Sequence, residues 1–257
     1  SYSQNKKIKY IKRKPTLPDG LNHTELVISE LNSEYAVIFH DDDILHHEYI
    51  KKISPFILNS SISAVGTNAF IFNNKTHDVK KKMHDFKDIK KFHNKKNFLQ
   101  QYLLGTGGSA PFSGYVYKTK YLKKLSIKSI TPGKHADVEL LASLMEYGSI
   151  LWLPEVLMFY RVHQSSSSSN ENVHDRLKLL RYMYSEGINR NSKPVFLFKY
   201  LYWVNWIVQQ GTSKSNILKW KYRVVLKFLV FRSVNVILSF FFWKTVFKKI
   251  KASLFFQ

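Results

Sequence analysis

Residues 35–45 read Tyr-Ala-Val-Ile-Phe-His-Asp-Asp-Asp-Ile-Leu, a short apolar run that ends in three consecutive carboxylates. An apolar run of this length, rich in β-branched and aromatic residues, predicts a buried strand. Asp41, Asp42 and Asp43 would then follow its carboxyl end, where α/β folds place their ligand sites. The stretch therefore predicts an α/β fold with an acidic site at the end of a strand.

The chemistry of this acidic stretch has two interpretations. Adjacent carboxylates repel one another unless a positive group lies between them. Hard divalent cations prefer oxygen ligands, so a metal ion together with a diphosphate is one candidate partner. The alternative is an acidic turn that caps the next helix, because Asp is a favoured N-cap residue. The spacing alone leaves both interpretations open.

A second segment with a regular pattern of helix and strand signals runs from Ala136 to His163. Residues 137–148 predict a helix that opens with an Asp and stops at a Gly, with apolar residues at i, i+3 and i+7. The stretches 150–153 and 156–160 predict two short strands, and the second leads to Arg161 and His163.

The remaining pattern up to residue 175 alternates between strands and helices. We expect strands at 8–11, 62–72 and 115–117, and helices at 24–31, 46–58 and 98–104. Residues 73–97 predict a polar loop with a short helix. The glycine turns at 105–108 and 113–114 either line the bound sugar or only turn the chain.

These segments together resemble the family 2 glycosyltransferases, which are inverting enzymes of the GT-A fold. The resemblance covers roughly residues 8–170 and rests on four motifs in the family's order: the acidic strand end, the Asp at a helix start, Gly148-Ser-Ile-Leu-Trp-Leu, and Tyr160-Arg-Val-His163. It implies a GT-A, Rossmann-like mixed sheet with flanking helices.

Two departures from the family pattern affect the expected site. Family members begin with an apolar strand, a Tyr-Asn turn and a second strand that ends in Asp-Asp-Gly-Ser, which together hold the nucleobase and ribose. Residues 6–15 resemble the short strand that follows these parts, so we expect the sequence to lack the first two βα units. His40 stands where many relatives carry the first Asp of the acidic motif.

The resemblance implies a role for each remaining acid and for the basic loop. Asp42 is the best match for the ligand of Mn²⁺ or Mg²⁺, with Asp41 near the ribose or the metal waters and Asp43 as a further contact of the nucleotide sugar. Arg161 and His163 would donate hydrogen bonds to the diphosphate. Without the family pattern, a salt bridge and a surface imidazole are the simpler interpretations.

Asp137 matches the family's catalytic Asp and is the expected general base. A helix N-terminus stabilises an ionised carboxylate, which predicts a low pKa for this group. The alternative is that Asp137 only caps its helix. Glu139 is the second candidate base, although on a helix it would point elsewhere.

Composition limits the possible partners and compartments. The chain has 257 residues, 44% hydrophobic content, no cysteine and a formal charge of +22. The lack of cysteine excludes disulfides and thiolate metal sites. The charge suits nucleic acid, anionic lipid or an anionic substrate. Because no RNP-like, helix-turn-helix or zinc-finger pattern is present, we expect no nucleic-acid partner, although a basic nucleic-acid-binding protein stays as an alternative.

The carboxyl-terminal part predicts a second, helical region. We divide the chain into a partial catalytic domain, 1–175, and a basic, aromatic region, 176–257. Between 219 and 256, lysines alternate with aromatic residues, which suits a membrane interface. Its longest uncharged run, 233–243, is shorter than the roughly 18–20 residues of a spanning helix. We expect this region to attach the protein peripherally to a membrane. A chain that ends near Lys193 should then keep its catalytic core folded. The alternative is that the region is a pair of helices packed on that core.

The sequence as a whole predicts a metal-dependent inverting glycosyltransferase. It would transfer a sugar from a nucleotide-sugar donor to a lipid-linked glycan acceptor at the cytoplasmic face of the cell membrane, in the assembly of a surface polysaccharide such as a capsule or O-antigen. A glycosyltransferase fragment without catalysis is the remaining alternative.

Overall fold

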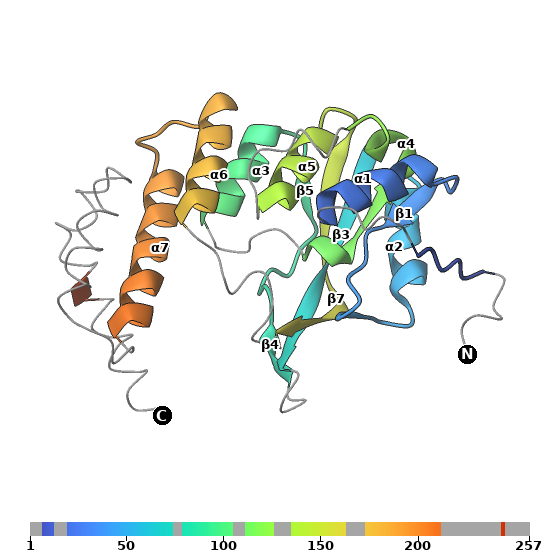
Figure 1. The fold of residues 1–257 in the computed structure, drawn as a ribbon, viewed down its shortest axis with the longest axis horizontal. Helices are drawn as coiled ribbons and strands as arrows, with labels where there is room; N and C mark the ends of the chain where they lie inside the picture. Colours follow the sequence, from blue (N-terminus) through green and yellow to red (C-terminus); the bar gives the residue numbers. More distant parts are fainter. Residues whose placement is uncertain are drawn as a thin grey trace.

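Two long parallel strands, β3 (Ile62–Asn73) and β7 (Ser149–Val162), form the centre of the sheet. The computed structural model describes residues 7–12, 20–73, 79–104, 111–125, 135–162, 173–211 and 243–244. In this part of the chain the sheet has seven strands in the order β1-β6-β3-β7-β2, with β4 beside β3 and β5 beside β7 (Figure 1). Every pair other than β3 with β7 is antiparallel. The shorter strands are β1 (Tyr35–Val37), β2 (Ile44–Leu45), β4 (Val79–Lys82), β5 (Lys90–Phe92) and β6 (Tyr115–Lys118).

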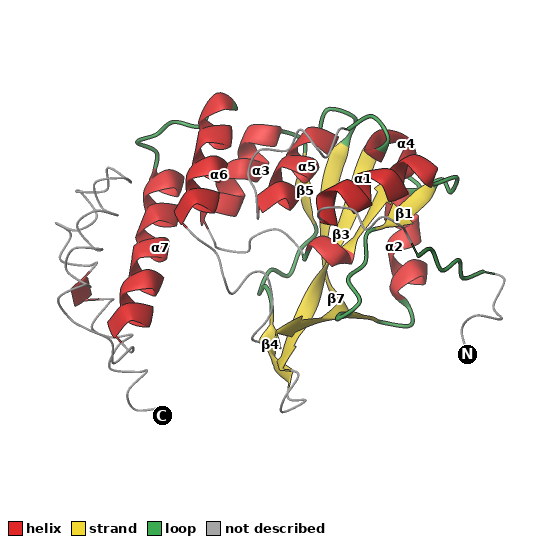
Figure 2. Ribbon diagram, in the orientation of Figure 1, coloured by secondary structure: helices red, strands yellow, loops and turns green. Residues whose placement is uncertain are grey.

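Helices cover both faces of this sheet (Figure 2). Side chains alternate between the faces along each strand, so Ile150 and Trp152 of β7 enter one core while Leu151 and Leu153 enter the other. The second core is closed by α2 (Tyr49–Ile57). The first and larger core lies under the remaining helices: α1 (Gly20–Glu30), α3 (Lys95–Leu104), α4 (Thr119–Leu122), α5 (Ala136–Leu144), α6 (Val173–Ser185) and α7 (Lys193–Gly211).

The predicted mixed α/β sheet with flanking helices is confirmed, and three local predictions need correction. Residues 8–12 form no strand and are exposed, because they pair with no strand of the described sheet. The region 73–97 contains β4 and β5 in addition to the start of α3, because the long edges of β3 and β7 offer partners for both. The two strands predicted at 150–153 and 156–160 are one strand, and its register against β3 shifts between Leu153 and Met158, where β7 carries extra residues.

The strand that precedes the acidic stretch also differs from its prediction. β1 has 3 residues, all partly buried, where a fully buried strand is expected. The reason is its place at one end of the strand order, paired only with β6 within the described residues.

The larger core continues past residue 175 into α6 and α7. Leu179 and Met183 of α6, with Val195 and Phe198 of α7, belong to the same apolar cluster as Leu141 of α5. Helix α7 also contacts α3 directly, and Figure 1 shows α3, α6 and α7 in one row beside the sheet. None of the described helices combines the length and apolar character that crossing a bilayer requires.

Candidate active site

The acidic stretch forms a turn between β1 and β2, and its three carboxylates have different environments. Asp41 is exposed, Asp42 is partly buried, and the side chain of Asp43 keeps only 1% of its surface exposed. Three neighbouring residues therefore divide into one that faces solvent, one at the boundary and one in the interior.

Asp43 connects this turn to two distant parts of the chain. Its Oδ1 accepts a hydrogen bond of 2.9 Å from the backbone N–H of Arg161, near the end of β7. Its Oδ2 accepts a hydrogen bond from Ser113 Oγ, which lies in a 3-10 turn, Phe112–Gly114, just before β6. A buried carboxylate needs such donors, because burial without partners costs several kcal/mol, by rough estimate. Asp43 thus anchors the turn to β7 and to the start of β6.

The side chains of His40, Asp42 and Asp43 are arranged so that one metal ion can bind among them. Each offers a ligand atom, and these atoms all lie within 4.8 Å of one another. His40 Nδ1 lies 4.0 Å from Asp43 Oδ2. Two carboxylates and an imidazole are ordinary ligands of divalent metals, so this donor set fits the expected ion. Asp41 does not belong to this group, and its expected place near the ribose or the metal waters stays a prediction.

Asp137 lies in the first turn of α5, whose N-cap residue is His135. The simple capping alternative therefore does not describe its position. The residue keeps part of its surface exposed, but its carboxyl group is densely surrounded by protein atoms. Burial raises the pKa of this carboxyl, and it outweighs the lowering by His135, by the amides of Asp137 and Val138, and by His40.

The predicted low pKa of Asp137 is therefore wrong. The N-terminal amides of α5 do favour the ionised form, as expected, but the cost of desolvation is larger. The electrostatic interaction with His40 relates Asp137 to the acidic turn, although the two residues are far apart in the sequence.

Glu139 faces a different part of the molecule. Burial raises the pKa of the Tyr182 hydroxyl on α6, and Glu139 adds to that rise through its charge. Asp137 interacts electrostatically with His40 of the acidic turn, and Glu139 interacts with Tyr182 of α6, so Asp137 is the better placed of the two candidate bases.

Arg161 is held by its backbone and by an aromatic ring. Its N–H binds Asp43, and its guanidinium carbon lies 5.1 Å from the centre of the Phe72 ring, a cation–π contact. His163 and the glycine turn at 105–108 lie outside the described residues. Gly114 is described, and a side chain there would meet Met158 Sδ at 2.7 Å, so the turn that carries Ser113 packs tightly against β7.

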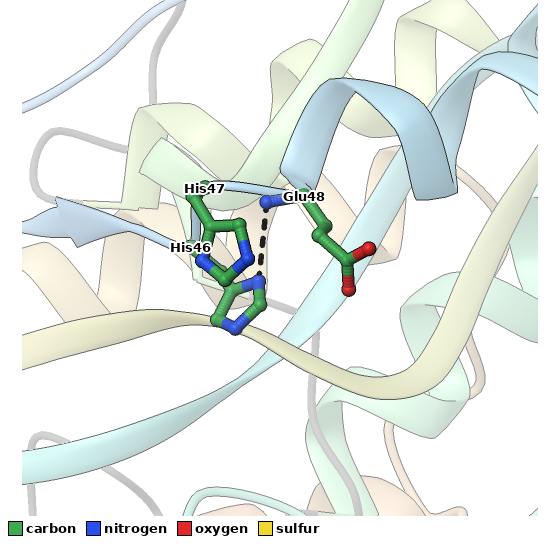
Figure 3. Close-up of side chains that lie close together, drawn as sticks. All are labelled: His46, His47 and Glu48. Atoms are coloured by element: carbon green, nitrogen blue, oxygen red, sulfur yellow. Dashed lines mark hydrogen bonds between the residues drawn. The ribbon is translucent and has the colours of Figure 1, made fainter.

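Two features were not predicted from the sequence. The first is the hydrogen bond from Ser113 to Asp43, because the 113–114 turn was expected only to line a sugar or to turn the chain and its partner is 70 residues away. The second is a group of adjacent side chains, His46, His47 and Glu48, that lie close together before α2 (Figure 3). The centroids of the two imidazole rings are 4.2 Å apart, and the Glu48 N–H donates a hydrogen bond of 3.2 Å to His46 Nδ1. The run of three metal-ligating residue types was the available signal.

The chain matches no protein-family model and no curated protein. Among solved structures it is similar to the crystal structure of S. aureus TarS, residues 1–349, in complex with UDP-GlcNAc, with 15% sequence identity and a TM-score of 0.43. The match covers 67% of this chain and 48% of that one. This chain therefore spans about half the length of the solved structure that it matches.

Proposed function

We propose that the chain is a metal-dependent inverting glycosyltransferase that moves a sugar from a nucleotide-diphosphate donor to a glycan acceptor. The observation that carries the proposal is the pairing of a metal-competent acidic turn with Asp137. The turn brings His40, Asp42 and Asp43 together, and the buried Asp137 carboxyl interacts with His40. A metal held by the acidic turn would neutralise the leaving diphosphate, and Asp137 would act as the base for the acceptor hydroxyl.

Sugar transfer requires that negative charge on the departing diphosphate be neutralised. A divalent metal held by Asp42 and Asp43 would supply Lewis-acid neutralisation at that diphosphate. Asp43 is fixed by the Arg161 N–H and by Ser113, so its position does not depend on the ligand. The exposed Asp41 would lie at the solvent side, near the ribose, and Arg161 and His163 would add positive donors.

Asp137 would act on the acceptor. It would take the proton of the acceptor hydroxyl as that oxygen forms its bond to the anomeric carbon, while the bond from that carbon to the diphosphate oxygen breaks. The electron pair of the broken bond leaves with the nucleoside diphosphate, and attack by the acceptor oxygen from the opposite face inverts the anomeric carbon. A raised pKa makes the carboxylate a stronger base, which suits this step.

We infer further that the acceptor is a lipid-linked glycan and that the protein works at the cytoplasmic face of a membrane, in surface-polysaccharide assembly. The formal charge of +22 supports attraction to anionic lipid. The alternating lysine and aromatic residues between 219 and 256 support the same inference. Within this stretch the structure describes residues 243–244 only.

A donor-hydrolysis assay tests the proposed activity. The whole chain would be incubated with UDP-, GDP- and dTDP-sugars, with Mn²⁺ or after chelation, and released nucleotide would be measured. We expect metal-dependent release from one donor, and its loss in Asp42→Asn. The matched control is Asp88→Asn, an exposed acid elsewhere in the chain, which should behave as wild type. Release from no donor, or release that Asp42→Asn leaves unchanged, would contradict the proposal.

A further inference from the structure

We propose that His40 is a nitrogen ligand of the metal site and that it makes the site prefer first-row transition metals to Mg²⁺. The inference rests on the proposed function and deepens it, because it concerns which ion the same site takes. It starts from the arrangement of His40 beside Asp42 and Asp43, with ligand atoms within 4.8 Å.

The distances match those of ligands that share one ion. Metal–ligand bonds of about 2.1 Å in octahedral geometry place two ligand atoms roughly 3 Å apart when adjacent and about 4.2 Å apart when opposite. His40 Nδ1 and Asp43 Oδ2 are 4.0 Å apart. The two atoms therefore fit one coordination sphere without a rearrangement of the backbone.

One side of this pair is rigid and the other is adjustable. Asp43 is buried and held by Ser113 and by the Arg161 N–H. The His40 side chain is 48% exposed, and the centroid of its ring lies 6.1 Å from that of Phe112. Because so much of the side chain faces solvent, it can turn toward an ion at little cost in packing energy. The backbone N–H of Asp43 donates to His40 O at 3.4 Å, which closes the turn and keeps both side chains on it.

An imidazole changes the metal preference of a site. Mg²⁺ is bound by oxygen ligands, whereas imidazole nitrogen suits transition metals, and affinity at such sites rises from Mn²⁺ to Co²⁺ and beyond. A neutral imidazole also brings no negative charge, so Mg²⁺ loses attraction that a third carboxylate would add. We therefore expect the affinity order Co²⁺, then Mn²⁺, then Mg²⁺.

The other histidine group supplies the control. His46 Nδ1 already accepts the Glu48 N–H, and Glu48 pairs with Lys51 at 3.4 Å. His47 is exposed in the same segment and close to the acidic turn in sequence, but outside the His40 group. Removal of its imidazole should leave the site of His40 unchanged.

Pulsed electron paramagnetic resonance of Mn²⁺ added alone to the whole chain tests the assignment. We expect nitrogen modulation from a bound imidazole in wild type and in His47→Gln. In His40→Gln this modulation should vanish and Mn²⁺ affinity should fall at least about tenfold, since even outer-shell partners contribute that much. His40→Asp should bind Mn²⁺ without nitrogen modulation and should raise the affinity for Mg²⁺ relative to Mn²⁺. Melting temperatures of all variants confirm that each is folded.

Three results would overturn the assignment: no Mn²⁺ binding by wild type, bound Mn²⁺ without nitrogen modulation, or modulation that persists in His40→Gln. These outcomes differ from failure of the proposed function, which is the absence of metal-dependent nucleotide release. Release that persists while bound Mn²⁺ shows no nitrogen would remove His40 from the site and leave the transferase proposal in place.

Discussion

Asp41, Asp42 and Asp43 share one chemistry and differ only in what surrounds them. Asp43 accepts two protein hydrogen bonds in the interior, which makes it an anchor of the turn as well as a metal ligand candidate. Asp42 lies at the boundary between protein and solvent, where a carboxylate can reach both an ion and a substrate. The neighbouring His40 adds the donor type that would decide which ion binds.

Asp137→Asn should separate function from stability. The pKa of the folded-state carboxyl is raised by burial, so its ionised form is disfavoured in the folded protein. The wild type therefore loses stability as pH rises through that pKa, and the loss is absent below the unfolded-state value near 3.9. We expect the Asn variant to melt at a higher temperature than wild type at pH 7–8, an approximate range, with the gain shrinking toward pH 4.

The same variant should lose roughly 10²–10⁴-fold of its transfer rate, the usual contribution of a general base. Melting curves across pH and turnover of the identified donor are the two measurements, with Asp88→Asn as the control for loss of a surface charge. A variant that melts lower than wild type at neutral pH and turns over normally would assign Asp137 to the helix start alone.

Among the elements, the parallel pair of β3 and β7 depends on a close approach at Gly148. The Ser149 N–H donates to Ser61 O at 2.8 Å, and Ser63 Oγ donates to Gly148 O at 3.0 Å. A Cβ at Gly148 would lie 2.8 Å from Ser61 O and 3.1 Å from Ser63 N, both backbone atoms that cannot rotate away.

Gly148→Ala should therefore force the start of β7 away from the chain before β3. Overpacking of this kind costs about 1–3 kcal/mol, so we expect a lower denaturant midpoint by chemical unfolding. Ser60→Ala, in the exposed turn beside Ser61, is the control and should stay within about 0.5 kcal/mol of wild type. Equal stability of the two variants would show that the backbone yields at this point.

Across the whole molecule, α6 and α7 complete the larger core. Val195, Phe198 and Tyr202 of α7 are each no more than 7% exposed and pack in the cluster that includes Leu103 of α3. The expectation that a chain ending near Lys193 keeps its core does not agree with this packing, because that cut removes α7. A cut after Gly211 retains every helix from α1 to α7 and removes Trp243, which packs against the edge of this core.

Two truncations should distinguish core from tail. Burial of one large apolar side chain contributes about 1.5–3 kcal/mol, so loss of the three α7 side chains removes an amount comparable with the roughly 5–15 kcal/mol that stabilises a domain. We expect a chain ending at Ser192 to lose cooperative thermal unfolding, and a chain ending at Gly211 to keep it.

The longer truncation also tests membrane attachment. Sedimentation with anionic liposomes should bring down the full chain, and not the chain that ends at Gly211. Neutral liposomes are the control, since each basic residue near an anionic surface adds about 1 kcal/mol. Equal sedimentation of both chains would assign lipid binding to the folded core.

The sequence by itself determined the elements, because their patterns are local. Strand alternation and helical spacing identified β3, β6, α2 and α3, and the run of acids and Asp137 in the first turn of α5 gave the candidate site. Tertiary structure alone decided which partners these residues meet and how deeply they are buried. The Arg161 N–H reaches Asp43 across 118 residues, and Ser113 reaches it across 70. Burial reversed the expected pKa direction of Asp137, and α7 packs into the larger core although it lies beyond the predicted boundary at residue 175. Local periodicity depends on backbone geometry within one element, whereas burial and hydrogen-bond partners depend on which distant strands and helices meet.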